Sequence, residues 1–172
     1  PAHLPGWTSL TGSRVSIIKG EYIRRSIIKR RRMPISASGL RKVVYVETRQ
    51  GQSLPRVLKK ANQQGTILAG MSAGALCWFD WAASDYAWTG RSLPLRCLGL
   101  IKGSCATHWR GERNRRADYI RLIKEGLLPS GYGIDDGAAV LFENGSFAEV
   151  VSSKPGASAS RIERSGTTVK ES

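Results

Sequence analysis

The chain has few of the residues that cross-link a small protein or bind metal. In 172 residues there are two histidines and three cysteines, Cys77, Cys97 and Cys105. An odd number of cysteines without a CxxC pair argues against a disulfide framework or a zinc site and favours a reducing cytoplasm. Two histidines are too few for a histidine-rich metal site. We therefore expect a cytoplasmic protein with no metal and no cofactor.

Long apolar runs are missing as well. No stretch approaches the roughly 20 apolar residues that a membrane helix needs. The N-terminus starts at Pro1 without an initiator Met and lacks the apolar core of a signal peptide. The sequence therefore predicts neither a membrane partner nor export. Its composition, 41% hydrophobic and 23% charged, is that of an ordinary globular protein, and its length fits one domain.

Acidic residues are scarce in the first third of the chain. Residues 1–60 hold 14 of the 27 basic residues and two of the 13 acidic ones, so most of the net charge of +14 belongs to this stretch. A protein that binds nucleic acid through its fold carries the basic face on the folded part. Nucleic acid is therefore not the expected partner, and binding through residues 14–42 is kept as an alternative.

Apolar patterning divides the chain into three parts. Residues 1–40 form an atypical basic segment with short, interrupted apolar runs. Residues 41–160 alternate strand and helix patterns, which indicates an α/β fold with a mostly parallel sheet flanked by helices. Residues 161–172 are a polar tail, and we expect fraying after Pro155.

Several elements of the α/β part can be placed. Strands are predicted over residues 43–46, 66–69 and 98–101, and helices over 54–64, from 75 to 81 and over 114–125, the last with Ala117, Ile120, Leu122 and Ile123 inward. Asn144-Gly145 predicts a tight turn that pairs residues 138–142 with 147–151 in a hairpin.

Gly70-Met-Ser-Ala-Gly74 matches the pattern G-x-S-x-G between a predicted strand and a predicted helix. This is the setting of a nucleophile elbow, in which the glycines permit a tight, strained turn that projects the Ser72 hydroxyl. The helix behind it directs free N–H groups, such as that of Ala73, toward developing negative charge. A glycine-rich turn without catalytic function is the alternative interpretation.

A serine hydroxyl is a weak nucleophile unless a base removes its proton. His3 lies in the atypical terminus, so His108, which follows a predicted strand and a loop of small residues, is the candidate base. Asp135 and Asp136 end a further predicted strand and are candidates to orient that histidine. A surface histidine and a plain Asp-Asp-Gly turn are the alternatives.

Four blocks occur in the order GTILAGMSAGALCWFD, LGLIKGSCATHWRGERNRRADY, GIDDGAAVLFENG and VVSSKPGA. Together they resemble the peptidase E and cyanophycinase family of serine peptidases over residues 54–159. The resemblance implies a fold related to class I glutamine amidotransferases and a triad of Ser72, His108 and Asp136. Peptidase E cleaves dipeptides with an N-terminal aspartate and cyanophycinase a polymer of aspartate and arginine, so the implied substrate is a short acidic peptide.

The chain departs from the family pattern in two places. Thr107 precedes the histidine where the family usually has a proline. Residues 47–51 replace the Gly-Gly-Asn-type loop that supplies a second oxyanion-hole N–H, and the first strand and helix of the family fold are not recognisable in residues 1–40. The alternative hypothesis is therefore a catalytically impaired or truncated relative of peptidase E without a complete oxyanion hole.

Charged residues just after the histidine are candidates to bind a peptide carboxylate, chiefly Arg115 and Arg116 together with Glu112. Charged first turns of helices are usually solvated, which is the alternative interpretation. Trp78, Phe79 and Trp81 are expected in the core. The sequence leaves a homodimer open.

The basic N-terminal segment should pack poorly, because its apolar runs are short and flanked by like charges. Limited trypsin digestion is expected to cut first within residues 24–32, where arginines and lysines cluster. First cuts within residues 54–150 would contradict this expectation.

Overall fold

A computed structural model describes residues 14–17, 35–37 and 54–172. The predicted strand over 43–46, the loop over 47–51 and the basic cluster over 24–32 lie outside the described residues. Within them, the strands form two mixed sheets, one of five strands and one of six. The predicted α/β class is confirmed.

The first sheet is built around a short parallel group. Strand β3 (Leu68–Gly70) pairs in parallel with both β1 (Arg14–Ile17) and β2 (Ile35–Ala37). The hairpin of β8 (Ala138–Glu143) and β9 (Ser146–Ser152) then joins β1 in antiparallel pairing. The predicted hairpin across Asn144-Gly145 is therefore confirmed.

The second sheet also has a parallel centre. Strand β6 (Ile101–Thr107) pairs in parallel with β4 (Phe79–Ser84) and with β7 (Gly131–Ile134). Antiparallel strands extend both sides of this group: β5 (Leu93–Arg96) beyond β4, and β10 (Ala159–Ser165) followed by β11 (Thr168–Glu171) beyond β7.

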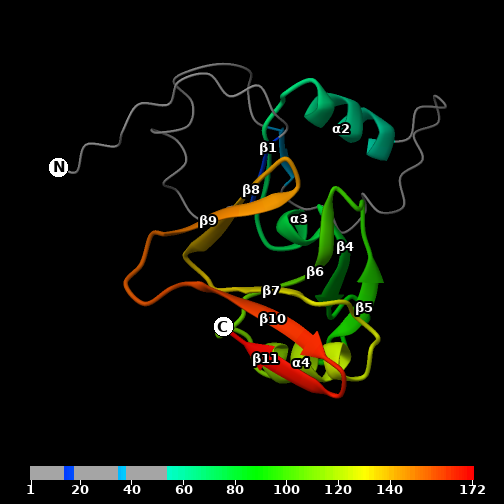
Figure 1. Ribbon diagram of the computed structural model, residues 1–172, viewed down its shortest axis with the longest axis vertical. Helices are drawn as coiled ribbons and strands as arrows, with labels where there is room; N and C mark the ends of the chain where they lie inside the picture. The colour runs from blue at the N-terminus through cyan, green and yellow to red at the C-terminus, as the bar shows by residue number, and fades with distance from the viewer. Residues whose placement is uncertain (1–13, 18–34, 38–53) are drawn as a thin grey trace.

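Helices lie at the two ends of the molecule and between the sheets. Helix α2 (Leu54–Gln63) lies beside the first sheet and α4 (Arg115–Lys124) beside the second (Figure 1). The short α3 (Ala73–Leu76) contacts β3 of one sheet and β4 and β6 of the other. No described helix is long and apolar enough to cross a membrane.

Two apolar clusters make the core. One gathers residues of both sheets, α2 and α3, with Trp78 and Phe79 fully buried and the Phe79 and Phe142 rings edge to face at 5.6 Å. The other lies between α4 and the second sheet and contains Trp109 and Tyr119. Trp78 and Phe79 are thus in the core as expected, and Trp81 is partly buried against the second cluster.

The helix expected from residue 75 to 81 is much shorter than predicted. It ends at Leu76, and the chain enters β4 at Phe79. The aromatic residues there pair with β6 and are buried, so tertiary pairing overrides the helical pattern. Helix α4 turns Leu122 and Ile123 inward as predicted, but Ala117 is exposed. Asp118 is also buried, and its carboxylate accepts bonds from Arg91 Nε and the Ser92 N–H.

The strand expected over residues 98–101 begins later and runs to Thr107. Instead, the backbone N–H groups of residues 98–100 donate hydrogen bonds to the carbonyls of residues 77–79. From residue 103 to 107 the strand consists of small residues, and its neighbour β7 comes very close. A Cβ on Gly131 of β7 would collide with the Ser104 carbonyl of β6.

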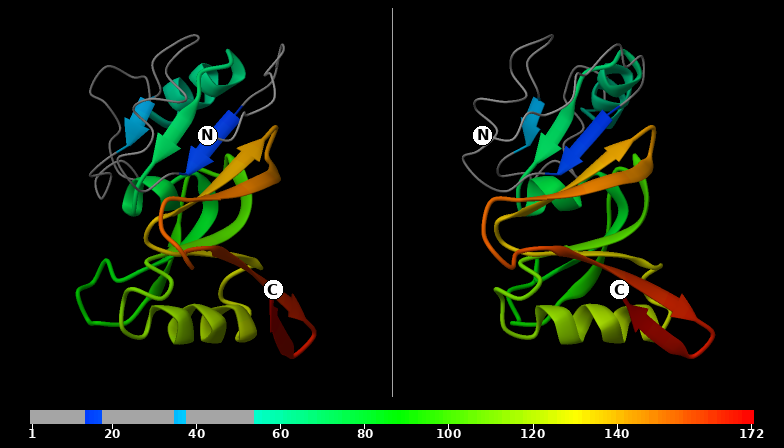
Figure 2. Two further views of the ribbon diagram at one scale, coloured as in Figure 1. Left: turned by 90° about the vertical axis from the view of Figure 1, so that its left-hand side faces the viewer. Right: turned by 60° about the vertical axis from the view of Figure 1, so that its left-hand side comes forward.

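The fraying expected after Pro155 is wrong. Strand β10 pairs with β7, and β11 pairs with β10. Figure 2 shows this hairpin beside α4. The polar surface of the hairpin hides one buried position, Ile162, which is fully enclosed in the second cluster.

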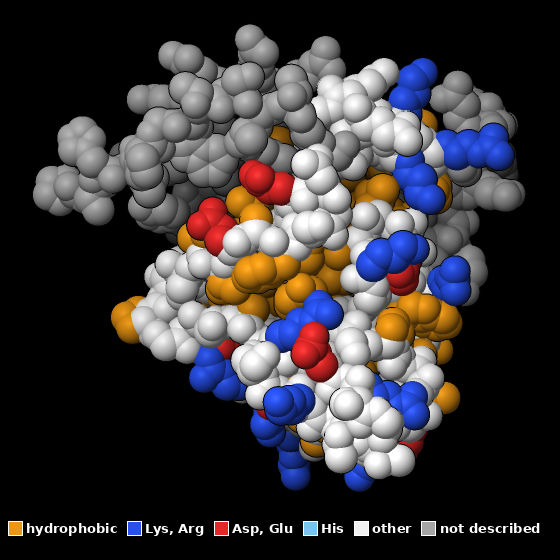
Figure 3. Space-filling view, viewed as in Figure 1, with side chains coloured by type: hydrophobic (Ala, Val, Ile, Leu, Met, Phe, Trp, Pro, Cys, Tyr) orange, Lys and Arg blue, Asp and Glu red, His pale blue; other side chains and the backbone are white. Residues whose placement is uncertain are grey.

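One edge of the first sheet is exposed along its length. Every residue of β9 is exposed, including Phe147, Val150 and Val151. Figure 3 shows apolar side chains at the surface around this strand. An open edge invites pairing with another chain, and a homodimer stays a prediction.

Ile162→Ala tests whether the C-terminal hairpin belongs to the core. We expect the free energy of unfolding, measured by urea denaturation, to fall by about 2–5 kcal/mol because the truncation leaves a cavity. Glu163→Ala, at the exposed neighbouring position, should change it by about 0.5 kcal/mol or less. An equally small effect of Ile162→Ala would mean that the hairpin contributes little to folding.

Candidate active site

Ser72 lies in the sharp turn between β3 and α3. Its φ of 55° and ψ of −122° fall in a region that residues with side chains rarely adopt. The turn is tight enough that a Cβ on Gly70 would collide with the Gly74 carbonyl. The glycine at position 70 is therefore explained by a close backbone approach, and Ser72 lies in the same tight turn.

His108 meets Ser72 from the second sheet. The Ser72 Oγ lies 2.9 Å from His108 Nε2. His108 itself has φ of 58°, so both residues of this contact follow a strand and sit in a strained turn. Its side chain is largely enclosed, with 17% exposed.

Asp136 contacts the other nitrogen of the same ring. Asp136 Oδ1 lies 2.8 Å from His108 Nδ1. Strands β6 and β7 are parallel and pair Thr107 with Ile134, so the residues that follow them emerge at the same sheet edge. Because a carboxylate only accepts, Nδ1 donates to Asp136, which leaves Nε2 to accept from the Ser72 hydroxyl.

Asp135 points elsewhere and forms an ion pair with Arg110. Its carboxylate accepts bonds from Arg110 Nε at 2.9 Å and from the Ser158 N–H at 3.0 Å. Arg110 Nη2 also donates to the Gly156 carbonyl at 2.7 Å. The pair thus ties together the segments after β6, β7 and β9.

The surroundings of Asp135 lower its pKa. Burial by itself would raise the pKa of this carboxyl, but the hydrogen bonds from Arg110 and Ser158 and the charge of Arg110 outweigh burial. Asp135 is therefore ionised at neutral pH, and its carboxylate is engaged in the ion pair with Arg110. Of the two aspartates that the sequence offered, the structure places Asp136 at the histidine.

Comparison with known proteins fits this arrangement. The family model described as Peptidase family S51 matches residues 43–150, which include Ser72, His108 and Asp136. The chain belongs to peptidase family S51. It is similar to the uncharacterized peptidase YgaJ of Bacillus subtilis (strain 168), with 43% identity over 109 residues, 63% of this chain. The aligned part covers 46% of that relative's length.

Most of the backbone N–H groups that follow Ser72 in this S51 chain donate hydrogen bonds within the turn and helix. Gly74 donates to the Met71 carbonyl, and Ala75 and Leu76 donate to the Ser72 carbonyl. The N–H of Ala73 is the first of α3 and, like other first helical N–H groups, has no intrahelical acceptor. With four residues, α3 has a smaller dipole than the helix predicted from the sequence.

Arg115 and Arg116 are both engaged within the fold. The Arg115 side chain is 8% exposed. Its guanidinium donates to the Ala83 carbonyl at 3.1 Å and to Ser92 Oγ at 2.9 Å, and it pairs with Glu112. Arg116 pairs with Glu171 and lies over the Trp109 ring. Their predicted use in substrate binding stays a prediction.

The three cysteine thiols are poor candidates for a nucleophile. Burial raises the pKa of the Cys77 and Cys105 thiols, and it raises that of Cys97 to about 12. All three are free thiols. Protonated thiols are poor nucleophiles. Among the described residues, no group of three or more His, Cys, Asp or Glu side chains is placed to hold a metal ion.

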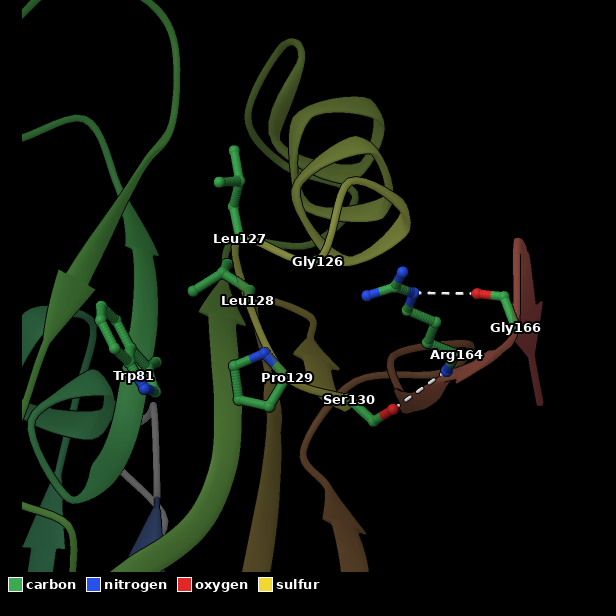
Figure 4. A pocket seen from close by; sticks show the side chains of 8 residues that line it. All are labelled: Trp81, Gly126, Leu127, Leu128, Pro129, Ser130, Arg164 and Gly166. Atoms are coloured by element: carbon green, nitrogen blue, oxygen red, sulfur yellow. Dashed lines mark hydrogen bonds between the residues drawn. The ribbon is translucent and has the colours of Figure 1, made fainter.

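A shallow pocket lies away from this site. Trp81, Leu127, Pro129 and Arg164 are among the residues that line it, beside the end of α4 (Figure 4). Arg164 spans the pocket wall, with its Nε donating to the Gly166 carbonyl and its backbone N–H to Ser130 Oγ. None of Ser72, His108 and Asp136 lines this pocket.

The Asp135–Arg110 pair should give the protein a pH-dependent stability. Because folding lowers the pKa of Asp135, its contribution is present above the ordinary value of 3.8 and is lost as pH falls below it. Asp135→Asn should therefore lower the unfolding free energy by about 1–3 kcal/mol at neutral pH. This difference from wild type should shrink in acid.

Urea denaturation of both proteins at neutral pH and below the ordinary carboxyl pKa measures this difference. Glu125→Gln removes an exposed i,i+4 pair with Arg121 and serves as the matched control. Its effect should be about 0.5 kcal/mol or less. A loss for Asp135→Asn that is equal at both pH values would contradict the electrostatic origin.

Proposed function

We propose that this S51 chain is a serine peptidase of the dipeptidase type, which hydrolyses short acidic peptides through Ser72, His108 and Asp136. The observation that carries the proposal is the continuous line of contacts from Ser72 Oγ through both ring nitrogens of His108 to Asp136. A serine, a base and an orienting acid in this order are the components of acyl transfer by an activated hydroxyl.

In the first half of the reaction, Ser72 Oγ attacks the scissile carbonyl carbon while His108 Nε2 takes the hydroxyl proton. The resulting imidazolium is oriented and stabilised by Asp136 through Nδ1–H. When the tetrahedral intermediate collapses, Nε2 gives its proton to the leaving amine and an ester to Ser72 remains. Water then attacks this acyl-enzyme with His108 again as the base, which releases the acid product and restores the serine.

The oxyanion of each tetrahedral intermediate needs hydrogen-bond donors. The N–H of Ala73, directly after the nucleophile, is the donor that we assign. A donor of this kind contributes about 10²–10³ in rate. The family's second donor corresponds to residues 47–51, which lie outside the described residues.

The acidic nature of the substrate rests on the resemblance to peptidase E and cyanophycinase. Location in the cytoplasm rests on the three free thiols, which persist in reducing compartments. A second candidate, a catalytically impaired relative, is favoured by the sequence of residues 47–51, which places Glu47 where the family has glycines. It keeps Ser72 and His108 in contact but stabilises the oxyanion poorly.

Ser72→Ala is the direct test. Hydrolysis of the dipeptide Asp-Leu should fall by about 10⁴-fold or more, because no nucleophile is left. Unfolding free energy should barely change, and labelling by a fluorophosphonate probe should disappear. Ser146→Ala, at an exposed position in β9, is the matched control and should retain both activity and labelling.

Three outcomes separate the possibilities. Turnover by Ser72→Ala at the wild-type rate would overturn the nucleophile assignment. Labelling of wild type without turnover of acidic dipeptides would favour the impaired relative. If wild type shows no labelling and no turnover, the proposed function is wrong.

A further inference from the structure

A carboxylate lies beside the Ser72–His108 contact. Glu112 Oε1 is 3.9 Å from His108 Nε2, the same nitrogen that contacts Ser72 Oγ. This distance is too long for a hydrogen bond. The Glu112 side chain is 47% exposed. The carboxylate therefore borders both the nucleophile and the solvent from which a substrate enters.

The position of Glu112 is fixed from behind. Its other carboxylate oxygen pairs with Arg115, whose buried guanidinium is held by the Ala83 carbonyl and Ser92 Oγ. The backbone N–H of Glu112 donates to the His108 carbonyl at 3.1 Å. Because Arg115 holds one oxygen, Oε1 remains directed at the site. The sequence predicted that Glu112 and two arginines bind a peptide carboxylate. In the structure, Arg115 instead forms an ion pair with Glu112.

The geometry of a peptide brings its α-nitrogen close to this oxygen. For attack, the scissile carbonyl carbon must lie about 3–3.5 Å from Ser72 Oγ. Standard bond lengths and angles place the α-nitrogen of the same residue about 2.5 Å from that carbon. The α-nitrogen therefore lies within a few ångströms of the Ser72–His108 contact, where Glu112 supplies negative charge.

We propose that Glu112 binds the free α-ammonium of the first residue of the peptide. The proposal rests on the proposed peptidase function and deepens it. An ammonium gives a charge-assisted hydrogen bond to the carboxylate, whereas a blocked amine has no charge to offer. The same negative charge repels an acidic substrate side chain, which must point away from Glu112.

The test compares the dipeptide Asp-Leu with N-acetyl-Asp-Leu. Wild type should prefer the free amine by about tenfold or more in kcat/KM, since hydrogen bonds to charged groups contribute this much. Glu112→Gln should lose most of that preference, mainly through a higher KM for Asp-Leu, and Glu112→Asp should keep part of it. Glu125→Gln, an exposed glutamate at the end of α4, is the matched control and should behave as wild type.

Binding gives a second measurement that needs no turnover. Titration calorimetry of Ser72→Ala with the two peptides should show tighter binding of Asp-Leu. Preferential binding without hydrolysis by wild type would overturn the peptidase function and leave the ammonium site standing. Equal hydrolysis or equal binding of the two peptides would overturn the ammonium site and leave the peptidase function standing.

A different role for Glu112 has a different signature. If Glu112 acts on the His108 imidazolium, Glu112→Gln should shift the pH profile of kcat equally for both peptides. That result, with the free-amine preference intact, would overturn the proposal. A Glu112→Gln variant that does not fold leaves the wild-type comparison of the two peptides and its calorimetric counterpart as decisive tests.

Discussion

The close approach of the Gly70 and Gly74 backbones around Ser72 is the constraint on which the site depends. Because Gly70 has no Cβ to strike the Gly74 carbonyl, the chain can leave β3 and enter α3 in one sharp turn. Ser72, at the tip, takes a conformation that costs of order 1–3 kcal/mol. The burial of Gly74, Ala75 and Leu76 directly behind it holds the turn in place.

The second half of the site depends on parallel pairing. Strands β6 and β7 end in register at Thr107 and Ile134, so His108 and Asp136 leave the sheet side by side. Close packing of small residues brings these strands together. The Arg110–Asp135 pair then joins the segments that follow the strands. The two adjacent aspartates thus have different roles. Asp135 links segments of the chain, and Asp136 contacts the His108 imidazole.

Local patterns predicted some elements well and others poorly. Helix α2 and the β8–β9 hairpin were placed correctly because Gly65 and Asn144-Gly145 mark their ends by backbone conformation alone. The helix after Ser72 and the C-terminal strands were not. Residues from Phe79 onward take strand form because β6 offers a partner, and β10 is held by β7 and by the burial of Ile162.

The sequence by itself determined the residue types of the site: a serine between two glycines, a histidine outside the basic terminus and an acid at Asp135 or Asp136. These follow from chemistry and from φ/ψ limits, which act within a few residues. The family resemblance implied Asp136 as the acid, and the tertiary structure places Asp136 at His108. Only the tertiary structure shows that Arg115 pairs with Glu112 and that Glu112 lies beside the His108 nitrogen that contacts Ser72. The contacts of His108 with Ser72 and Asp136 join residues 36 and 28 positions apart, and the contacts of Glu112 depend on where His108 and the buried Arg115 are placed. They are set by strand pairing and by the partners that buried charges require, neither of which is encoded in a local pattern.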